Sequence, residues 1–221
     1  MREIDKLKNN FFFQKIPIIR NHMRWNKKFD YPKSIRSTEN GIRRYVIGDT
    51  KLPSVTSVLD LTRSDEEKAA LANWRERTGH QAAEAITSAA ASRGSKMHAY
   101  LESFILNREN LSFFDDGEQH KIMAKQIIEK GLINRLEEVW GVEATLFYPN
   151  RYSGTTDAVG IFDGKESIID FKQSNKPKKP QYIDSWLLQT AAYSLAHNVV
   201  YKSNITACVI LVCTVDNLFQ E

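Results

Sequence analysis

Residues 154–172 read Gly-Thr-Thr-Asp-Ala-Val-Gly-Ile-Phe-Asp-Gly-Lys-Glu-Ser-Ile-Ile-Asp-Phe-Lys, and this stretch decides the fold. Two β-prone runs flank Asp163-Gly164. Asp-Gly between apolar runs is the strongest short-range signal of a β-hairpin. Counting outward from a two-residue turn places Asp157 opposite Asp170, with Cβ atoms about 5 Å apart.

The two facing carboxylates repel each other unless a divalent cation lies between them, and Mg²⁺ and Mn²⁺ prefer such oxygen ligands. Lys172 follows Asp170 by two residues, so strand alternation predicts its ammonium on the same face. Phe171 then points away and leaves its carbonyl near the site. Two alternatives stay open: an ordinary hairpin with solvated charges, and a longer turn that moves Asp157 to the other face.

The composition is that of a globular protein: 221 residues, of which 42% are hydrophobic and 26% charged. The net charge of +4 is unevenly spread, because residues 1–45 hold twelve Lys or Arg and four acids. We predict a basic N-terminal extension over 1–41 and one domain over 42–221. Such an extension suits a polyanionic partner, although a solvated charged segment explains the same pattern.

The two cysteines, Cys208 and Cys213, lie in an apolar run that is typical of a buried strand. They support neither a disulfide framework nor a cysteine-rich zinc or iron-sulfur site. No 18-residue apolar run occurs in the sequence, which argues against a membrane span or a secretory signal. We therefore predict a soluble, intracellular protein of a reducing compartment.

The first half of the domain is predicted to be mainly helical. A strand over 42–47 precedes a short element that ends near Leu61. Ser64 with Glu67, and then Thr78 with Gln81, form capping-box patterns ahead of two helices, the second reaching about Leu106. An amphipathic helix is expected over 119–139.

The second half is predicted to form the sheet. A strand over 142–148 starts near Glu143 and leads into the hairpin. A basic, proline-containing loop over 175–180 separates the hairpin from a helix. The apolar run 205–215 predicts a buried strand, and the order strand, helix, strand implies a parallel pair.

Four motifs follow one another along the chain: Arg93-Gly94-x-x-x-His98, Gly154-x-x-Asp157, Asp170-Phe171-Lys172 and Gln189-x-x-x-Tyr193. Each one is weak alone, since an Asp-x-Lys triplet is frequent by chance. Four such motifs in this order, each on the predicted helix or strand that it requires, are a more specific signal. Together they resemble the PD-(D/E)XK nuclease superfamily, in particular its RecB-like exonuclease branch, which includes mitochondrial and phage exonucleases. The resemblance extends from about Arg43 onward.

This resemblance implies a restriction-endonuclease-like α/β core, with a central mixed β-sheet flanked by helices and a helical N-terminal half that covers or gates a channel for one DNA strand. It implies a catalytic set of Asp157, Asp170, Lys172 and His98. It also implies that Mg²⁺ or Mn²⁺ is bound by Asp157, Asp170, the Phe171 carbonyl and His98. The implied contacts to the substrate backbone are Gln189, Tyr193, Arg93 and Ser95.

The chemistry is consistent with these roles. Water attacks a phosphodiester in line, and a bound cation lowers the pKa of that water and neutralises charge on the phosphate oxygens. A lysine beside it can orient or deprotonate the water, or stabilise the anionic transition state. Outside the resemblance, Tyr193 reads as a core aromatic residue and His98 as an ordinary helix histidine. Glu143 is a weaker candidate for a metal or water contact.

The function that follows is a Mg²⁺- or Mn²⁺-dependent DNA exonuclease that prefers single-stranded ends, for DNA repair, recombination or replication. The expected setting is the cytoplasm of a bacterial cell or a phage-infected host. The partner is DNA, with no membrane, no nucleotide cofactor and, since the family's cysteine ligands are absent, no iron-sulfur cluster. The alternatives are a structure-specific or single-strand endonuclease of the same fold and a non-catalytic DNA-binding subunit.

Overall fold

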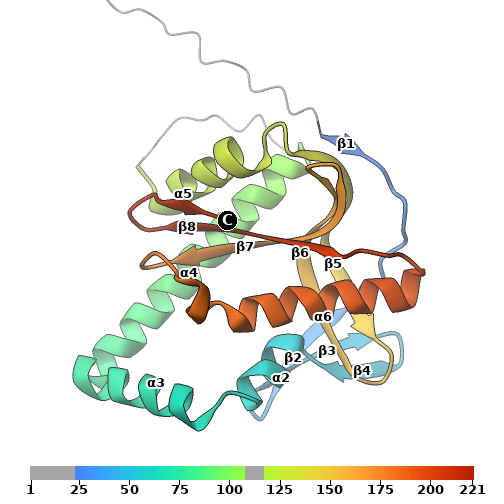
Figure 1. The fold of residues 1–221 in the computed structure, drawn as a ribbon. Coiled ribbons are helices and arrows are strands. Elements are labelled where there is room, and N and C mark those ends of the chain that lie inside the picture. Colours follow the sequence, from blue (N-terminus) through green and yellow to red (C-terminus); the bar gives the residue numbers. More distant parts are fainter. Residues whose placement is uncertain (1–22, 108–116) are drawn as a thin grey trace, which may run out of the picture.

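The computed structural model describes residues 23–107 and 117–221. Its centre is a six-stranded sheet with the strand order β1-β5-β6-β7-β8-β9 (Figure 1). The strands are β1 (Arg24–Trp25), β5 (Leu136–Tyr148), β6 (Tyr152–Phe162), β7 (Lys165–Ser174), β8 (Ala207–Thr214) and β9 (Phe219–Gln220). The neighbours β5, β6 and β7 are antiparallel, whereas β8 is parallel to β7. The predicted α/β class with a mixed central sheet is confirmed.

The β6–β7 hairpin has the register that the Asp-Gly turn predicts. Asp163 and Gly164 both have positive φ, at 45° and 74°, as the tight turn requires. Phe162 pairs with Lys165, and the ladder continues to the pair of Ala158 with Ile169. The longer-turn alternative is therefore excluded.

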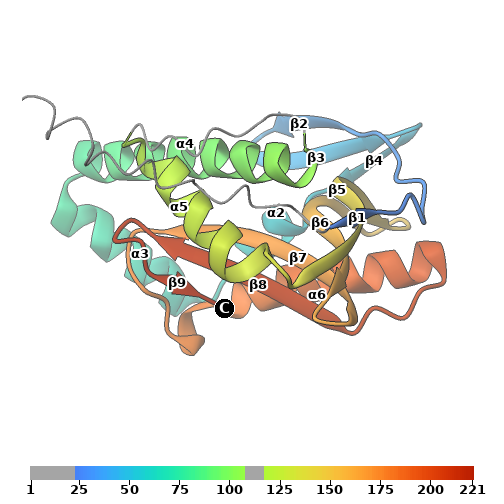
Figure 2. The ribbon, with the colours of Figure 1, turned by 90° about the horizontal axis from the view of Figure 1, so that it is seen from above.

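The described residues form five α-helices, which are α2 (Val55–Leu61), α3 (Asp65–Thr78), α4 (His80–Ile105), α5 (Gln119–Ile127) and α6 (Asp184–Tyr201). Helices α4 and α5 pack on one face of the sheet, around fully buried Met97, Leu101 and Met123. Helices α2 and α6 pack on the other face, around Val55 and Tyr193 (Figure 2). The sheet is therefore buried on both faces.

The helix starts were predicted with mixed success. At α3 the Ser64 hydroxyl accepts the Glu67 N–H and the Glu67 carboxylate accepts the Ser64 N–H, so this capping box is confirmed. The box predicted at Thr78 and Gln81 is wrong, because α4 begins at His80 and its N-cap residue is Gly79, which has φ of 82° and no side chain to cap the helix. Glycine tolerates this backbone conformation, which turns the chain from α3 into α4.

The helix predicted over 119–139 is too long. Helix α5 ends at Ile127, a π-helical turn η1 (Ile128–Leu132) follows, and strand β5 already begins at Leu136. Pairing of Leu136 with Phe162 overrides the amphipathic helical pattern, so the strand predicted from 142 starts six residues earlier. Glu143 consequently lies in the middle of the strand and not near its start.

A smaller three-stranded sheet contains β2 (Ile35–Glu39), β3 (Ile42–Ile47) and β4 (Thr50–Pro53). The strand predicted over 42–47 is confirmed, but the first half of the chain is helical only after this sheet. Strands β1 and β2 fall within the predicted extension 1–41, and β2 pairs with β3 beyond it. Residues 1–22 lie outside the described part, and the division at 41 stays a prediction.

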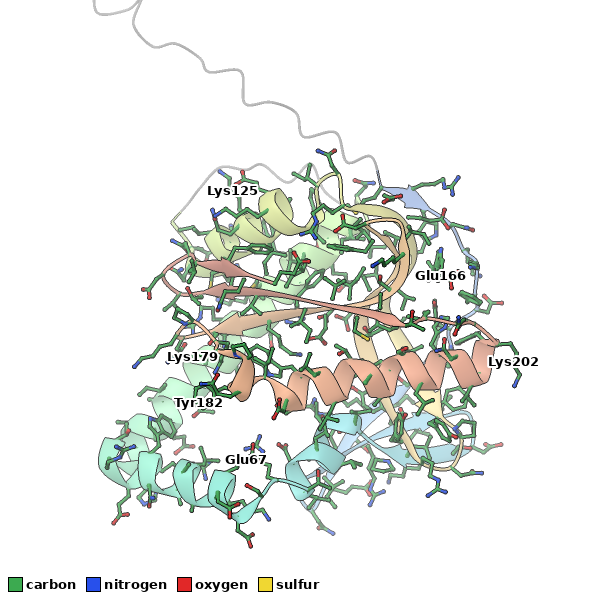
Figure 3. All side chains as sticks on the ribbon, in the orientation of Figure 1. Glu67, Lys125, Glu166, Lys179, Tyr182 and Lys202 are labelled. Carbon is green, nitrogen blue, oxygen red and sulfur yellow. The ribbon has the colours of Figure 1, made fainter. Side chains whose placement is uncertain are left out.

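Helix α6 connects β7 to the parallel strand β8, as predicted (Figure 1). A single 3₁₀ turn, η2 (Pro180–Tyr182), ends the basic loop and leads into α6. Figure 3 shows Lys179 and Tyr182 beside the first turn of α6 and Lys202 at its far end. Within the described ranges, none of the helices combines the length and the apolarity that crossing a membrane requires.

Both cysteines lie on β8 as free thiols. Cys213 is buried as predicted, but Cys208 is exposed. The reason is that Cys208 belongs to the less covered start of β8, whereas Cys213 packs in the core beneath α4 and α5.

Candidate active site

The site lies where the β6–β7 ladder opens. The last pair joins Ala158 to Ile169, so the two strands separate at Asp157 and Asp170. There the backbone N–H of Phe171 donates to Asp157 Oδ2 and not to a β6 carbonyl. The two aspartates, one on each of the separating strands, therefore line the same cleft. Each of them is at least 90% buried.

His98 reaches the aspartates from α4. Its neighbour Met97 and Leu101, one turn further on, are fully buried in the core and fix the orientation of this helix. His98 Nδ1 lies 2.9 Å from Asp157 Oδ1, and its ring meets the Phe171 ring edge-on. The motif histidine and the motif aspartate, 59 residues apart, are thus in direct contact.

Lys172 links β7 to α6. Its ammonium forms an ion pair with Asp170 and donates to Gln189 Oε1 at 3.1 Å. Gln189 Nε2 in turn donates to the Tyr193 hydroxyl at 3.0 Å. A Cβ on Gly154 would lie 2.6 Å from the Tyr193 ring, so glycine is required there for the ring to lie against β6. The four sequence motifs thus meet at one place.

Glu143 adds a third carboxylate. Its neighbours Val142 and Ala144 pair with Ala158 and Thr156, which places Glu143 across from Asp157. Glu143 has φ of 49°, a strained conformation for a residue with a side chain. Donor atoms of His98, Glu143 and Asp157 lie within 4.8 Å of one another. The hairpin predicted one pair of neighbouring carboxylates, Asp157 and Asp170. Glu143 and Asp157 form a second pair, across β5 and β6.

The crowding of charge shifts the pKa values of these groups. Burial, and then the charge of Asp157, raise the pKa of Glu143 to about 7. Burial also raises the pKa of Asp170, against the opposing effect of Lys172. For His98, burial alone would lower the pKa, but the charge and hydrogen bond of Asp157 outweigh it and the pKa is raised. Perturbed groups that gather in a cleft are typical of functional sites.

These residues line a cleft of about 830 Å³. Of the sequence-predicted residues, the cleft brings together Ser95, His98, Asp157, Asp170, Lys172, Gln189 and Tyr193. Arg93 is not among its lining residues, because its guanidinium binds Gln173 and Asn175 at the end of β7. Phe171 contributes its N–H, and the role predicted for its carbonyl stays a prediction.

The opposite wall of the cleft was missed by sequence reasoning. Lys33, Arg36, Arg43 and Tyr45 line it from β2, β3 and the segment before them. The sequence did contain a signal for this wall, because Arg43 and Tyr45 lie two residues apart on a predicted strand and therefore point to the same face. Lys33 and Arg36 fall within the predicted extension 1–41, whose charge suggested a polyanionic partner or a solvated segment but no place in the site.

Comparison with known proteins points to exonucleases. Over 174 residues the chain is 29% identical to mitochondrial genome maintenance exonuclease 1 of Mus musculus, covering 75% of this chain and 50% of that protein. The proteins of the same name from Homo sapiens and Xenopus tropicalis are 29% and 28% identical, with similar coverage. The chain thus spans about half the length of these curated relatives. No family model matches it.

The donor set fits a divalent cation. Two carboxylates and one imidazole converge in His98, Glu143 and Asp157, and a third carboxylate, Asp170, lines the same cleft. Mg²⁺ and Mn²⁺ favour carboxylate oxygens, and Mn²⁺ also accepts imidazole. Like charges held this close are costly without a cation, the more so because Asp157 and Asp170 are buried. The residues are therefore suited to hold one.

Proposed function

We propose that this protein is a metal-dependent DNA exonuclease that hydrolyses phosphodiester bonds. The observation that carries the proposal is the convergence of His98, Asp157, Asp170 and Lys172 from α4, β6 and β7 in one cleft. The names of the similar proteins support an exonuclease, and the donor set supports a metal. An acid cluster beside the half-buried Lys172 suits the attack of water on an anionic diester.

In this proposal His98, Glu143, Asp157 and Asp170 hold Mg²⁺ or Mn²⁺. When bound, the cation supplies Lewis-acid chemistry: it acidifies water and neutralises phosphate charge. The protein keeps the ligands in place, since the Phe171 N–H fixes one oxygen of Asp157 and His98 meets the other. Such preorganisation lets the ligands stay put while charge develops on the substrate.

Lys172 is the residue that acts on the attacking water or on the phosphate. Its ammonium is held between Asp170 and Gln189, which limits it to one position. As a cation it stabilises the negative charge of the transition state, and its N–H groups orient the attacking water. Gln189 and Tyr193 position Lys172, and we propose that they also contact the substrate backbone.

The finer assignments rest on the motif resemblance. We propose a PD-(D/E)XK nuclease of the RecB-like branch, with a preference for single-stranded ends and a role in DNA repair, recombination or replication. The motifs specify phosphodiester chemistry but neither polarity nor processivity. An endonuclease of the same fold, or a non-catalytic DNA-binding subunit, are the alternatives.

The test is cleavage of end-labelled single-stranded and double-stranded DNA with Mg²⁺ or Mn²⁺. We expect wild type to digest the linear single strand, and Asp170→Ala and Lys172→Ala to lose cleavage while still binding it. Lys165→Ala is the matched control, because Lys165 lies on the same hairpin but is exposed at its turn. This control should cleave like wild type.

If both site variants stay within about threefold of the wild-type rate, an effect below about 1 kcal/mol on the barrier, the proposed site is wrong. Cutting of circular single-stranded DNA would favour the endonuclease. Binding without any metal-dependent cleavage by wild type would favour the non-catalytic subunit.

A further inference from the structure

The cleft has a basic wall across from its acids. We use this term for Lys33, Arg36 and Arg43, which line the cleft from the small sheet and the segment that leads into it. Arg36 pairs with Tyr45 in the β2–β3 ladder, and Arg43 lies two residues before Tyr45 on β3. Strand alternation therefore gives Arg36, Arg43 and Tyr45 the same face, which is the face toward the cleft.

Among the described residues, no ion pair is formed by Lys33, Arg36 or Arg43, although Arg36 lies close enough to Glu143 to oppose the rise of its pKa. The opposite face of the same sheet is different, because Arg44 and Lys51 both form ion pairs with Glu39 there. Glu39 thus offsets part of the charge on the outer face of the sheet, whereas no ion pair holds the cations of the inner face. Unpaired cations of this kind, fixed on one wall of a cleft, are available to an anionic ligand.

The basic wall is attached firmly to the acid-bearing strands. Ser34 Oγ and Thr145 Oγ1 of β5 lie 2.8 Å apart. Ser54, which directly follows β4, forms an isolated parallel β-bridge with Ser153 of β6. Tyr31, just before the wall, has its hydroxyl 3.0 Å from His197 Nε2 on α6. The wall therefore keeps a defined position relative to Glu143 and Asp157, which a site for an ordered ligand requires.

We infer that the basic wall binds the phosphates of the DNA strand that flank the scissile one. This inference rests on the proposed function and adds the surface that holds the rest of the substrate. A strand that reaches the acids brings more negative charge into a cleft that is already acidic on one side. Cations on the facing wall offset this repulsion, and each phosphate contact releases counterions from the strand.

The experiment measures binding of a labelled 20-nucleotide oligothymidylate as a function of salt. It uses the Lys172→Ala background, so that the strand is not consumed. Into it we introduce Arg36→Ala and Arg43→Ala, each alone, and the triple change that also includes Lys33→Ala. Arg44→Ala is the matched control, since it removes the same charge from the outer face of the same sheet.

The slope of log K against log salt is negative, and each lost phosphate contact should make it less steep by about 0.7. Such a loss means that the gain in affinity between 1 M and 0.1 M salt becomes about fivefold smaller. The triple variant should lose about 2 units of slope. Arg44→Ala should keep the slope of the parent. In the Lys172-containing protein, the same wall variants should raise KM for the strand while kcat changes less.

Two results would overturn the inference, and they differ. If wild type cleaves the strand but the wall variants keep the parent slope, the basic wall is not a phosphate site and the proposed function stands. If wild type neither cleaves nor binds the strand, the inference falls together with the proposed function. Melting curves that match wild type show that the exposed substitutions leave the fold intact.

Discussion

Glu143 holds a backbone conformation that costs a residue with a side chain about 1 kcal/mol or more, in the middle of a strand. Such strain persists only where the surroundings determine it, and it often marks a functional position. The strained backbone here brings a carboxylate across from Asp157 and beside His98. Glu143 is exposed to the cleft, and we interpret it as a ligand because of this position and its strained backbone.

Glu143→Gln keeps the shape of the side chain and removes its charge. We expect Mn²⁺ binding, measured by isothermal titration calorimetry, to weaken by about tenfold or more. Glu137→Gln on the same strand is the control, because Glu137 is exposed and contacts the Gly164 N–H outside the cleft. Equal Mn²⁺ affinity in both variants would remove Glu143 from the site.

Gly154→Ala tests the close approach of Tyr193. The added methyl group would lie 2.6 Å from Tyr193 Cε1 and 2.8 Å from its hydroxyl, so the ring must move. We expect a loss of about 1–3 kcal/mol in the free energy of unfolding, together with a lower cleavage rate. Urea denaturation measures the first effect.

Gly94→Ala is the comparison for this change. The nearest atom there is Gln173 Cγ at 3.2 Å, in a side chain that can shift, and the substitution favours the α4 helix. We expect its free energy of unfolding to stay within about 1 kcal/mol of wild type. A similar loss in both variants would contradict the role given to the Tyr193 contact.

At the scale of helices and strands, short sequence motifs predicted those features that depend on residues close together in the sequence. The Asp163-Gly164 turn determined the hairpin register, and Ser64 with Glu67 determined the start of α3. The end of α5 was missed because pairing of Leu136 with Phe162, far apart in sequence, outweighs the helical pattern. The conformation of Glu143 has no local signal either, since glutamate does not favour positive φ.

Helix α6 is joined to the segment before β2 by an aromatic cluster around His197. Phe29, Tyr31 and Tyr201 surround its ring, while Tyr31 and Ser203 lie within hydrogen-bonding distance of its nitrogens. Burial lowers the pKa of His197 to about 4, from an ordinary value of 6.5. The folded protein thus keeps this imidazole neutral.

This shift predicts a pH dependence of stability. Between pH 6.5 and about 4 the unfolded chain binds a proton at His197 that the folded chain does not, so stability falls as the pH falls through this window. Up to about 3 kcal/mol of the free energy of unfolding depends on this group. Urea denaturation at a series of pH values measures it.

His197→Gln should reduce the slope of stability against pH within that window, because it removes the titrating group. An unchanged slope would show that other groups, and not His197, account for the acid sensitivity.

At the scale of the whole molecule, the cleft lies between two sheets, and this was the part least accessible from sequence. The acids come from the large sheet and the basic wall from the small one. Their approach depends on tertiary links such as that of Ser34 to Thr145, 111 residues apart. Motif spacing gave the acids and Lys172, but no spacing rule places Arg36 across from Glu143.

A cation bound between buried carboxylates should stabilise the entire fold, because it binds the native state alone. At a Mn²⁺ concentration one hundred times the Kd, the gain is about 2.7 kcal/mol. Thermal melting with and without Mn²⁺ measures it, and EDTA should reverse it. Asp157→Asn, whose amide oxygen can still accept the Phe171 N–H, should lose most of the gain. A melting temperature that is insensitive to Mn²⁺ in wild type would contradict the site.

The opening of the β6–β7 ladder also provides a reporter. The Phe171 amide proton is protected by the Asp157 carboxylate and not by a neighbouring strand. Its hydrogen-exchange rate is thus tied to one functional side chain, while the amides of Val159 and Ile168, within the ladder, follow the stability of the sheet. The hydrogen-exchange rate of the Phe171 amide therefore reports whether Asp157 keeps its position when metal or DNA binds. The measurement does not require the protein to cleave its substrate.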